Sequence, residues 1–387
     1  MDAALTPDEQ AFAAEARAWL AAHVEAPPGF ASLDEEIEWG QRWQATLAAD
    51  RWVGIHWPEE YGGRAATPVE VAIYNMEYAR AGAPQPVNRV GINLAGPTLL
   101  AHGTDEQRRR WLPAILTADD IWCQLFSEPG AGSDLAGLTT RGRPVDGGWE
   151  VTGQKVWTSY ARQARWGIAL VRTDLEAPKH RGLSFLVVDM QAPGIEVRPL
   201  VQLTGEAEFN EVFLDEVFVP DDHLVGAEHD GWTVANTTLA HERGTAFPFK
   251  EQVVHEVYLD RLFALAAERD AFDDVELADS LVDAFVALLV LRLHNWRTLS
   301  RLGRGEEPGA ESSIVKLAWT DMTHQLSDAG LALTGEASPL WLGARDVPDD
   351  GRWQRQWLWS KAASIAGGTS EIQRTIIGER LLGLPRG

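Results

Sequence analysis

The hydrophobic period of this chain changes twice, and this change constrains the fold more than any other feature. Apolar residues recur at helical spacing up to about residue 117, short β-rich runs separated by Gly, Pro and Asp follow, and helical spacing returns beyond Asp230. We therefore predict an α+β fold. Its expected parts are an N-terminal helical domain over 1–120, a middle β-barrel or sheet domain over 121–229 and a C-terminal helical bundle over 230–387.

Local signals predict where individual elements begin. Thr6 to Glu9 reads as a capping box with Pro7 at the first helical position, and Thr104 with Gln107 reads as a second one. Expected helices cover about 34–50, 67–81, 232–268, 276–303, 309–334, 353–364 and 369–382. Expected strands cover about 166–173, 183–189, 195–201 and 211–219.

Composition excludes several classes of function. A formal net charge of −23 makes nucleic acid an unsuitable partner, because phosphate backbones recruit Lys and Arg. Cys123 is the only cysteine, so no internal disulfide is possible, and no Cys/His cluster has the spacing of metal ligands. The apolar segment around 284–291 is too short for stable insertion in a membrane. We expect a cytoplasmic protein without a metal site.

Two glycine-containing stretches can carry chemistry. In Gln124–Asp134 a strand ends in a hydroxyl residue and then in Pro and Gly residues, so that the backbone can approach a planar or phosphorylated ligand closely. A plain connecting turn is the alternative. In Ile365–Arg374 two glycines lead into a capped helix, whose free N–H groups suit a phosphate or an oxyanion.

These two stretches, together with Val151–Ser159 and Phe209–Pro220, resemble motifs of the acyl-CoA dehydrogenase family. They follow one another in the family's order and cover nearly the whole chain. The resemblance implies the family's three-part fold and bound FAD. It also implies an acyl-CoA substrate and an electron-transfer flavoprotein as the acceptor of electrons.

The resemblance also implies roles for individual residues. Gln124, Phe126 and Ser127 would lie along the flavin ring, and Trp157 and Ser159 would cover its other side. Gly132 and Ser133 would face the pyrophosphate or the pantetheine arm of coenzyme A, and Thr369 and Glu371 would contact the pyrophosphate and adenosine portion of FAD. In a chain with 17 Trp, a packed core or interface residue is the alternative for Trp157.

Family motifs that complete the FAD site of a neighbouring subunit are altered here. Arg269 and Phe272 remain from one motif, but Asp273 replaces a glycine, and Gly335 remains from a double-glycine motif. A carboxylate near a diphosphate is unfavourable. Similar changes occur in bacterial members that assemble as heterotetramers of two different subunits and oxidise bulky, steroid-type side chains. The resemblance therefore implies a homo-oligomer or a heterotetramer with a related subunit.

The family's common catalytic base aligns with Gly367, which cannot take a proton. Some relatives carry the base on the long helix after the β-domain, where this chain has Glu242. In that arrangement the Gly367 N–H would donate to the thioester oxygen, and Arg243 would lie at the inner end of the pocket or near the flavin. The alternatives are a solvated Glu242, or His241 as the base.

The sequence thus predicts an acyl-CoA dehydrogenase that converts an acyl-CoA to a trans-2-enoyl-CoA, with a branched or bulky acyl group as a further hypothesis. One alternative is a non-catalytic partner subunit of a heteromeric acyl-CoA dehydrogenase. Another is a flavin oxidase or monooxygenase on the same fold.

Overall fold

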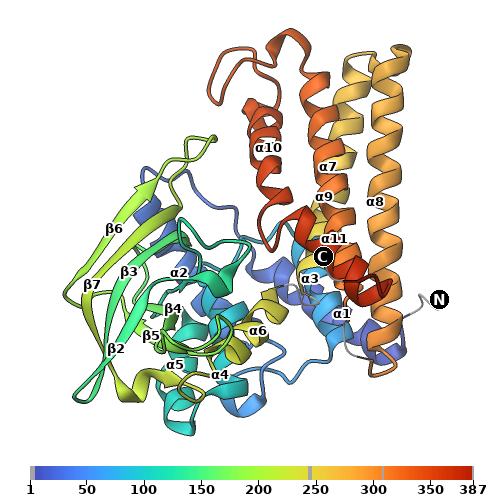
Figure 1. The fold of residues 1–387 in the computed structure, drawn as a ribbon. Coiled ribbons are helices and arrows are strands. Elements are labelled where there is room, and N and C mark those ends of the chain that lie inside the picture. Colours follow the sequence, from blue (N-terminus) through green and yellow to red (C-terminus); the bar gives the residue numbers. More distant parts are fainter. Residues whose placement is uncertain (1–4, 243–245, 307–308, 386–387) are drawn as a thin grey trace. The chain divides into compact units, whose positions relative to one another are not determined.

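A computed structural model describes residues 5–242, 246–306 and 309–385, with the backbone alone for 241, 242 and 246–248. The chain divides into two compact units. One consists of residues 1–25, 67–83 and 243–387 and is helical, and the other consists of residues 26–66 and 84–242 and contains the sheet. The N-terminal helices are therefore shared between the two units, since α1 and α3 belong to the helical one and α2, α4 and α5 to the other (Figure 1).

The helical unit is built from long, capped helices. The predicted capping box at Thr6 is confirmed, because its hydroxyl accepts from the Glu9 N–H and the Glu9 carboxylate accepts from the Thr6 N–H. Leu262, Leu288 and Leu326, from three different helices, meet in one apolar core. The helices of this unit are α1 (Pro7–His23), α3 (Pro68–Arg80), α7 (Ala246–Glu268), α8 (Val275–Leu302), α9 (Ser312–Leu333), α10 (Arg352–Ser360) and α11 (Ser370–Ile376).

Three helix predictions differ from the structure. The segment expected to be one helix over 232–268 contains α6 (Gly231–Glu242) and α7, and residues 243–245 between them lie outside the described residues. The helix expected over 353–364 ends at Ser360 and continues as a tighter 3₁₀ turn. The helix expected over 369–382 becomes a π-helical turn from Ile377. Sequence periodicity does not distinguish these tighter and wider turns from an α-helix.

The sheet unit contains the predicted middle β region, which forms one mixed sheet of eight strands. The strands pair in the order β6-β7-β3-β2-β4-β5-β8, and β1 pairs in parallel with β4. The strands are β1 (Trp122–Leu125), β2 (Arg141–Val145), β3 (Gly148–Ser159), β4 (Trp166–Arg172), β5 (Leu183–Asp189), β6 (Ile195–Leu200), β7 (Phe209–Pro220) and β8 (Leu224–Val225). The predicted fold class, helical parts around a middle sheet region, is confirmed.

Aromatic side chains join α5 of this unit to the sheet. Trp111 on α5 packs edge-to-face on Trp122 of β1 and Trp166 of β4, with ring centroids 5.9 and 5.8 Å away. The predicted capping box of Thr104 and Gln107 begins α5. The helices of this unit are α2 (Leu33–Ala49), α4 (Gly96–His102), α5 (Asp105–Thr117) and α6.

Candidate active site

The loop after β1 is attached to β3 by a buried ion pair. Lys155 has no exposed side-chain surface, and its Nζ donates to Glu128 Oε1 at 2.9 Å, to the Phe126 carbonyl at 3.0 Å and to the Leu170 carbonyl at 2.9 Å. These three acceptors satisfy all three ammonium protons. The Val156 N–H also donates to the Ser127 carbonyl at 2.9 Å. The predicted ligand loop is therefore fixed to the strand that carries Trp157.

The charge of Glu128 is strongly favoured by this environment. Burial alone would raise the pKa of its carboxyl group, but the attraction of Lys155 and the hydrogen bonds from Thr140 and Thr139 outweigh burial and lower that pKa to about 2. Burial lowers the pKa of Lys155 to about 8, against the opposing effect of Glu128. Both groups are charged at neutral pH.

Trp157 projects from β3 because the strand contains a β-bulge. The pairing with β7 shifts between Lys155 and Thr158, and Trp157 has a φ of +60°. The bulge allows Lys155 to lie beneath the loop while the Trp157 side chain remains 62% exposed. Left-handed backbone is costly for a bulky residue, and such strain is concentrated at functional sites. The Trp157 ring packs edge-to-face on Phe209, with a centroid distance of 6.1 Å.

The other predicted flavin residues of this unit differ in what they can offer a ligand. The Phe126 side chain is buried and packs edge-to-face on Phe185, so only its backbone is left for a ligand. Gln124, Ser127 and Ser159 are half-buried, whereas Gly132 and Ser133 are exposed. The Thr158 hydroxyl, next to Trp157, is buried and has no hydrogen-bond partner among the described residues.

The C-terminal stretch forms a left-handed turn followed by α11. Gly367 and Gly368 have φ angles of +67° and +94°, a conformation that favours glycine at both positions. Gln373 Nε2 donates to the carbonyls of these two glycines at 3.1 and 3.2 Å. The Oε1 atom of the same side chain is buried and has no partner among the described residues. The Thr369 hydroxyl accepts from the Ile372 N–H and caps the helix.

Two charged groups lie in this C-terminal turn. The Glu371 backbone N–H and the Thr369 hydroxyl lower the pKa of the Glu371 carboxyl group. Lys316 of α9 is buried, and its Nζ donates to the Ala363 carbonyl at 2.7 Å. Lys316 therefore supports the chain just before Gly367, the predicted donor to the thioester oxygen, and Thr369, a predicted FAD contact.

The structure brings together two predicted residues that are far apart in the sequence. Arg269 Nη1 donates to the carbonyls of Leu333 and Thr334 at 2.9 and 3.2 Å, immediately before Gly335. Phe272 is 52% exposed on the same unit. The two altered motifs are thus neighbours, and the Arg269 guanidinium binds its own chain.

The predicted base lies at the end of α6. Glu242 is the last residue of this helix and belongs to the sheet unit, whereas Gly367 belongs to the helical unit. The side chains of His241 and Glu242, and the whole of Arg243, lie outside the described residues. The roles assigned to these three residues therefore remain predictions.

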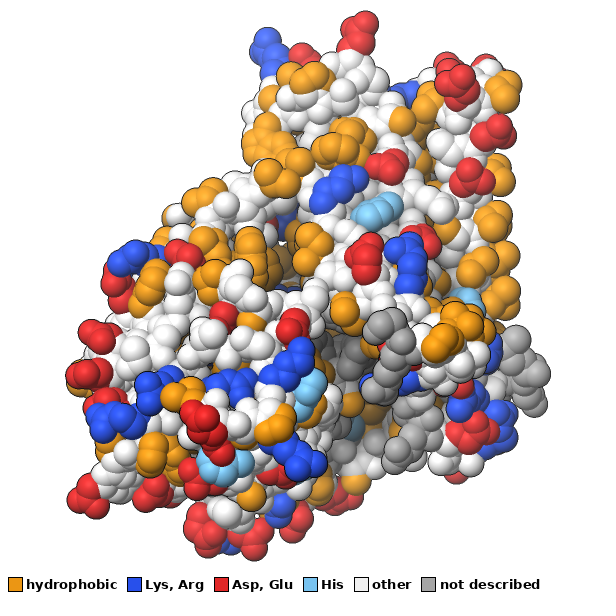
Figure 2. Space-filling model, viewed as in Figure 1, with side chains coloured by type: hydrophobic (Ala, Val, Ile, Leu, Met, Phe, Trp, Pro, Cys, Tyr) orange, Lys and Arg blue, Asp and Glu red, His pale blue; other side chains and the backbone are white. Residues whose placement is uncertain are grey.

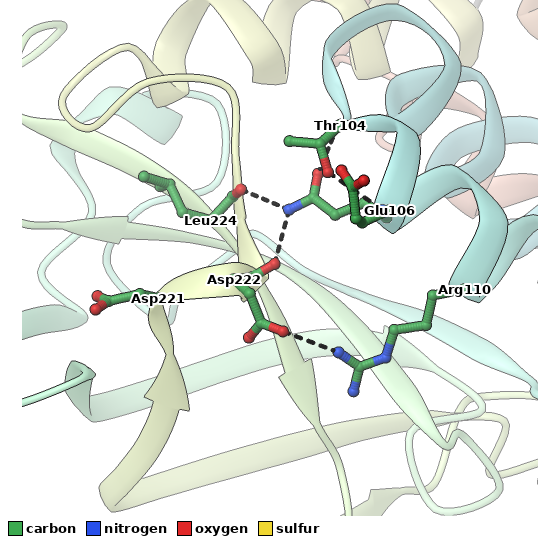
Figure 3. A pocket seen from close by; sticks show the side chains of 7 residues that line it. Thr104, Glu106, Arg110, Asp221, Asp222 and Leu224 are labelled. Carbon is green, nitrogen blue, oxygen red and sulfur yellow. Dashed lines mark hydrogen bonds and ion pairs between the residues drawn. The ribbon is translucent and has the colours of Figure 1, made fainter.

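A separate hollow of about 300 Å³ lies between α5 and the turn before β8, and none of its lining residues is a predicted site residue (Figure 3). Gln107 Nε2 donates to the carbonyls of Asp222 and Leu224 at 2.8 and 2.7 Å, and Arg110 pairs with the Asp222 carboxylate. These contacts use the polar groups for packing α5 on the sheet. Among the described residues there is no cluster able to hold a metal ion and no helix long and apolar enough to cross a bilayer.

Sequence reasoning missed Glu128, Lys155 and Lys316 as parts of the site. Glu128 and Lys155 stand inside the two quoted β-region stretches, but nothing in the sequence shows that they pair. A lysine on a strand normally faces solvent. The available signal was that Glu128 and Lys155 each stand inside a stretch that resembles a flavin-contacting motif of the family.

Comparison with known proteins identifies the class to which this fold and site belong. The chain matches the models of the acyl-CoA dehydrogenase N-terminal domain over residues 6–119, middle domain over 123–217 and C-terminal domain over 229–382. It is 40% identical to the acyl-CoA dehydrogenase IpdE1 of Mycobacterium tuberculosis over 98% of both chains. The chain belongs to the acyl-CoA dehydrogenase family and is an oxidoreductase of that family.

Two solved structures extend the similarity to three dimensions. The Tcur3481-Tcur3483 steroid acyl-CoA dehydrogenase has a TM-score of 0.87 and 28% identity, with 100% of both chains covered. The ChsE4-ChsE5 complex from Mycobacterium tuberculosis has a TM-score of 0.85 and 29% identity, again with 100% of both chains covered. The recognition of the family from its motifs is confirmed.

Proposed function

We propose that this enzyme uses FAD to remove two hydrogens from the α and β carbons of an acyl-CoA thioester, giving a trans-2-enoyl-CoA. The observation that carries this proposal is the exposed, strained Trp157 beside a loop that Lys155 fixes from below. An exposed aromatic ring on a rigid strand suits a planar ligand such as a flavin ring. The open backbone at Gly132 fits the same ligand.

The proposal assigns FAD contacts to individual residues. Gln124, Ser127 and the backbone of Phe126 hold one side of the flavin ring, and Trp157 and Ser159 cover the other. Thr369 and Glu371 hold the pyrophosphate and adenosine portion, and Gly132 and Ser133 face the pyrophosphate or the pantetheine arm. When bound, FAD supplies the acceptor for the hydride that leaves the β carbon.

Two further residues act on the thioester. Glu242 takes the α proton, because a carboxylate near the end of a helix can serve as a general base when it is desolvated. The Gly367 N–H donates to the thioester oxygen and stabilises the negative charge that develops there. The family resemblance assigns Arg243 to the inner end of the acyl pocket or the neighbourhood of the flavin, and His241 is the alternative base.

A Glu242→Gln variant tests the base. It retains the size and polarity of the side chain, so we expect the yellow flavin spectrum and acyl-CoA binding to be preserved. The rate of flavin bleaching on anaerobic mixing with substrate should fall by a factor of about 10² to 10⁴. His241→Gln is the matched control and should bleach at a rate close to wild type. Near-normal turnover in Glu242→Gln would contradict the assignment.

The acyl group of the substrate is bulky in this proposal. The support is similarity to structures whose names include a steroid acyl-CoA dehydrogenase. An anaerobic titration with straight-chain and steroid-type thioesters, followed by flavin absorbance, separates the two substrate classes. Preferential bleaching by straight-chain thioesters would contradict a bulky substrate.

The enzyme is oligomeric in this proposal, either with a second copy of itself or with a related subunit, and passes its electrons to an electron-transfer flavoprotein. Figure 2 shows apolar side chains along the outer edge of α8, where Val282, Val286, Leu289 and Leu293 are between 41 and 58% exposed. Such a continuous apolar face marks an interface. Asp279 and Arg297 are exposed nearer the two ends of α8, so an antiparallel second helix would find opposite charges. We place the oligomer in the cytoplasm, since Cys123 is a buried free thiol.

A second candidate function is a partner subunit that performs no chemistry itself. It is favoured by Arg269, whose guanidinium is hydrogen-bonded to the carbonyls before Gly335 rather than held free. Flavin content decides between the two. FAD content is measured in the chain purified alone and in the chain purified with a related subunit. We expect FAD in at least one of these two preparations. FAD bound only in sites without Trp157 would favour the partner role. Oxygen uptake without an electron acceptor would instead indicate a flavin oxidase.

A further inference from the structure

Glu128 joins the two ends of the loop that follows β1. Its Oε2 accepts from the N–H and the hydroxyl of Thr139, both at 2.7 Å, and its Oε1 accepts from the Thr140 N–H at 2.8 Å. Lys155 binds the same carboxylate from β3. The carboxylate therefore connects the start of the loop, its end and the neighbouring strand.

The middle of this loop is open while its ends are fixed. Gly130 and Gly132 have no atom within 4 Å of the position that a Cβ would occupy, and Ser133 is exposed. The backbone of Phe126 and Ser127, in contrast, is bound to Lys155 and Val156. Because Trp157 directly follows Lys155 and Val156 in β3, the loop and the ring of Trp157 share one anchor.

A buried ion pair is not needed to hold a sheet together. Backbone pairing with β7 holds β3 on both sides of the bulge, at Lys155 and at Thr158, and Arg143 pairs with Glu150 at the exposed end of β2 and β3. Replacing a buried pair with apolar residues is often neutral or stabilising, so such a pair contributes geometry more than stability. What this pair fixes is the position of the loop backbone relative to Trp157.

We propose that Lys155 and Glu128 are positioning residues, which hold the Phe126–Ser127 backbone and Trp157 in the spacing that a flavin ring requires. The inference rests on the proposed use of FAD. Both side chains are buried, so they act through the loop and the bulge, not by touching the ring. Loss of the pair should therefore change the loop even in the cofactor-free protein.

A double variant tests this proposal without leaving an isolated buried charge. Lys155→Met with Glu128→Gln removes both charges and keeps the volumes similar, so we expect a folded protein. In the cofactor-free double variant, amide hydrogen exchange over residues 126–140 should be faster than in the wild type, with the rest of the sheet unchanged. Its dissociation constant for FAD, measured by flavin fluorescence, should rise roughly tenfold or more.

Two further variants make the result decisive. Thr139→Val removes only the hydroxyl contact to Glu128 and should give a smaller change in the same direction. Arg143→Met with Glu150→Gln removes an exposed pair of the same sheet and should leave exchange over 126–140 and FAD affinity unchanged.

The proposal is overturned if the double variant folds and matches the wild type in both measurements. If the double variant does not fold, wild-type exchange and affinity in Thr139→Val overturn it instead. Failure of the wild type to bind FAD at all would contradict the proposed function, whereas the exchange comparison in the cofactor-free proteins would still test the anchor.

Discussion

Each compact unit has a lysine buried beneath a turn with predicted cofactor contacts, and the two lysines are compensated differently. Lys155 in the sheet unit has a carboxylate at 2.9 Å and two carbonyls. Lys316 in the helical unit donates to the Ala363 carbonyl at 2.7 Å, and the carboxylates of Glu371 and Asp321 act on it only through electrostatic attraction. One charge is neutralised at contact distance and the other is not.

The difference shows two ways of building a ligand turn. The Lys155–Glu128 pair has no net charge, so it can fix geometry and adds little electrostatic field outside the protein. Burial lowers the pKa of Lys316, and Glu371 and Asp321 raise it only in part. Where this ammonium is charged, it acts electrostatically on Glu371, a predicted FAD contact, in a chain with a net charge of −23. This local charge favours an anionic ligand that the protein as a whole would repel.

The largest effect should come from breaking the Lys155–Glu128 pair on one side. Lys155→Met leaves Glu128 buried and unpaired, and we expect the free energy of unfolding to fall by about 3–5 kcal/mol. Urea denaturation measures this change as a difference in the free energy of unfolding. Arg143→Met, which breaks an exposed pair, is the matched control and should cost less than about 1 kcal/mol. A loss in Lys155→Met as small as in the control would show that Glu128 finds other compensation.

Acid should weaken the sheet unit through the same pair. The pKa of Glu128 is lowered in the folded state, so its contribution to stability is full above the ordinary value of 4.5 and is lost as the pH falls toward about 2. In Glu128→Gln this part of the acid dependence should disappear. Unfolding midpoints measured between pH 6 and pH 2 in parallel for wild type and variant test it, and identical slopes would contradict the assignment.

Removing the second lysine should have a smaller effect. Lys316→Met deletes one hydrogen bond to Ala363, but the Thr320 hydroxyl still donates to the same carbonyl at 3.0 Å. We therefore expect the free energy of unfolding to fall by about 1 kcal/mol. The affinity for FAD is measured at low and at high salt, and the difference reports the electrostatic contribution of Lys316 to FAD binding. If the salt dependence of FAD binding is the same in Lys316→Met and wild type, the lysine does not act on the ligand.

The smallest effect on stability is expected at Trp157. Trp157→Gly relieves the left-handed backbone of an exposed residue, so the unfolding temperature of the cofactor-free protein should stay unchanged or rise slightly. The flavin spectrum and FAD affinity should nevertheless be altered, because the covering ring is gone. Phe218→Gly, at an exposed aromatic of the same sheet, is the control and should leave FAD affinity unchanged. A large loss of stability in Trp157→Gly would indicate that the tryptophan serves the core.

Local signals predicted much of the fold and part of the candidate site. The capping boxes at Thr6 and Thr104 fixed the starts of α1 and α5, since the residues of a capping box are close in sequence. The Gly367-Gly368 pair predicted a tight turn, and the structure has left-handed backbone at both. The β-bulge at Trp157 was not predictable, because it depends on pairing with β7 about 50 residues later.

The sequence by itself determined the family, the order of helical and β regions and the motifs around Phe126 and Gly367, because these are encoded by residues near one another in the chain. Tertiary structure decided which charges are buried and what compensates them. Lys155 meets Glu128 and Leu170 only when β1, β3 and β4 lie in one sheet, and Lys316 meets Ala363 only when α9 passes beneath the C-terminal turn. Burial and long-range pairing set the energy of a charge, and neither can be read from its neighbours in sequence.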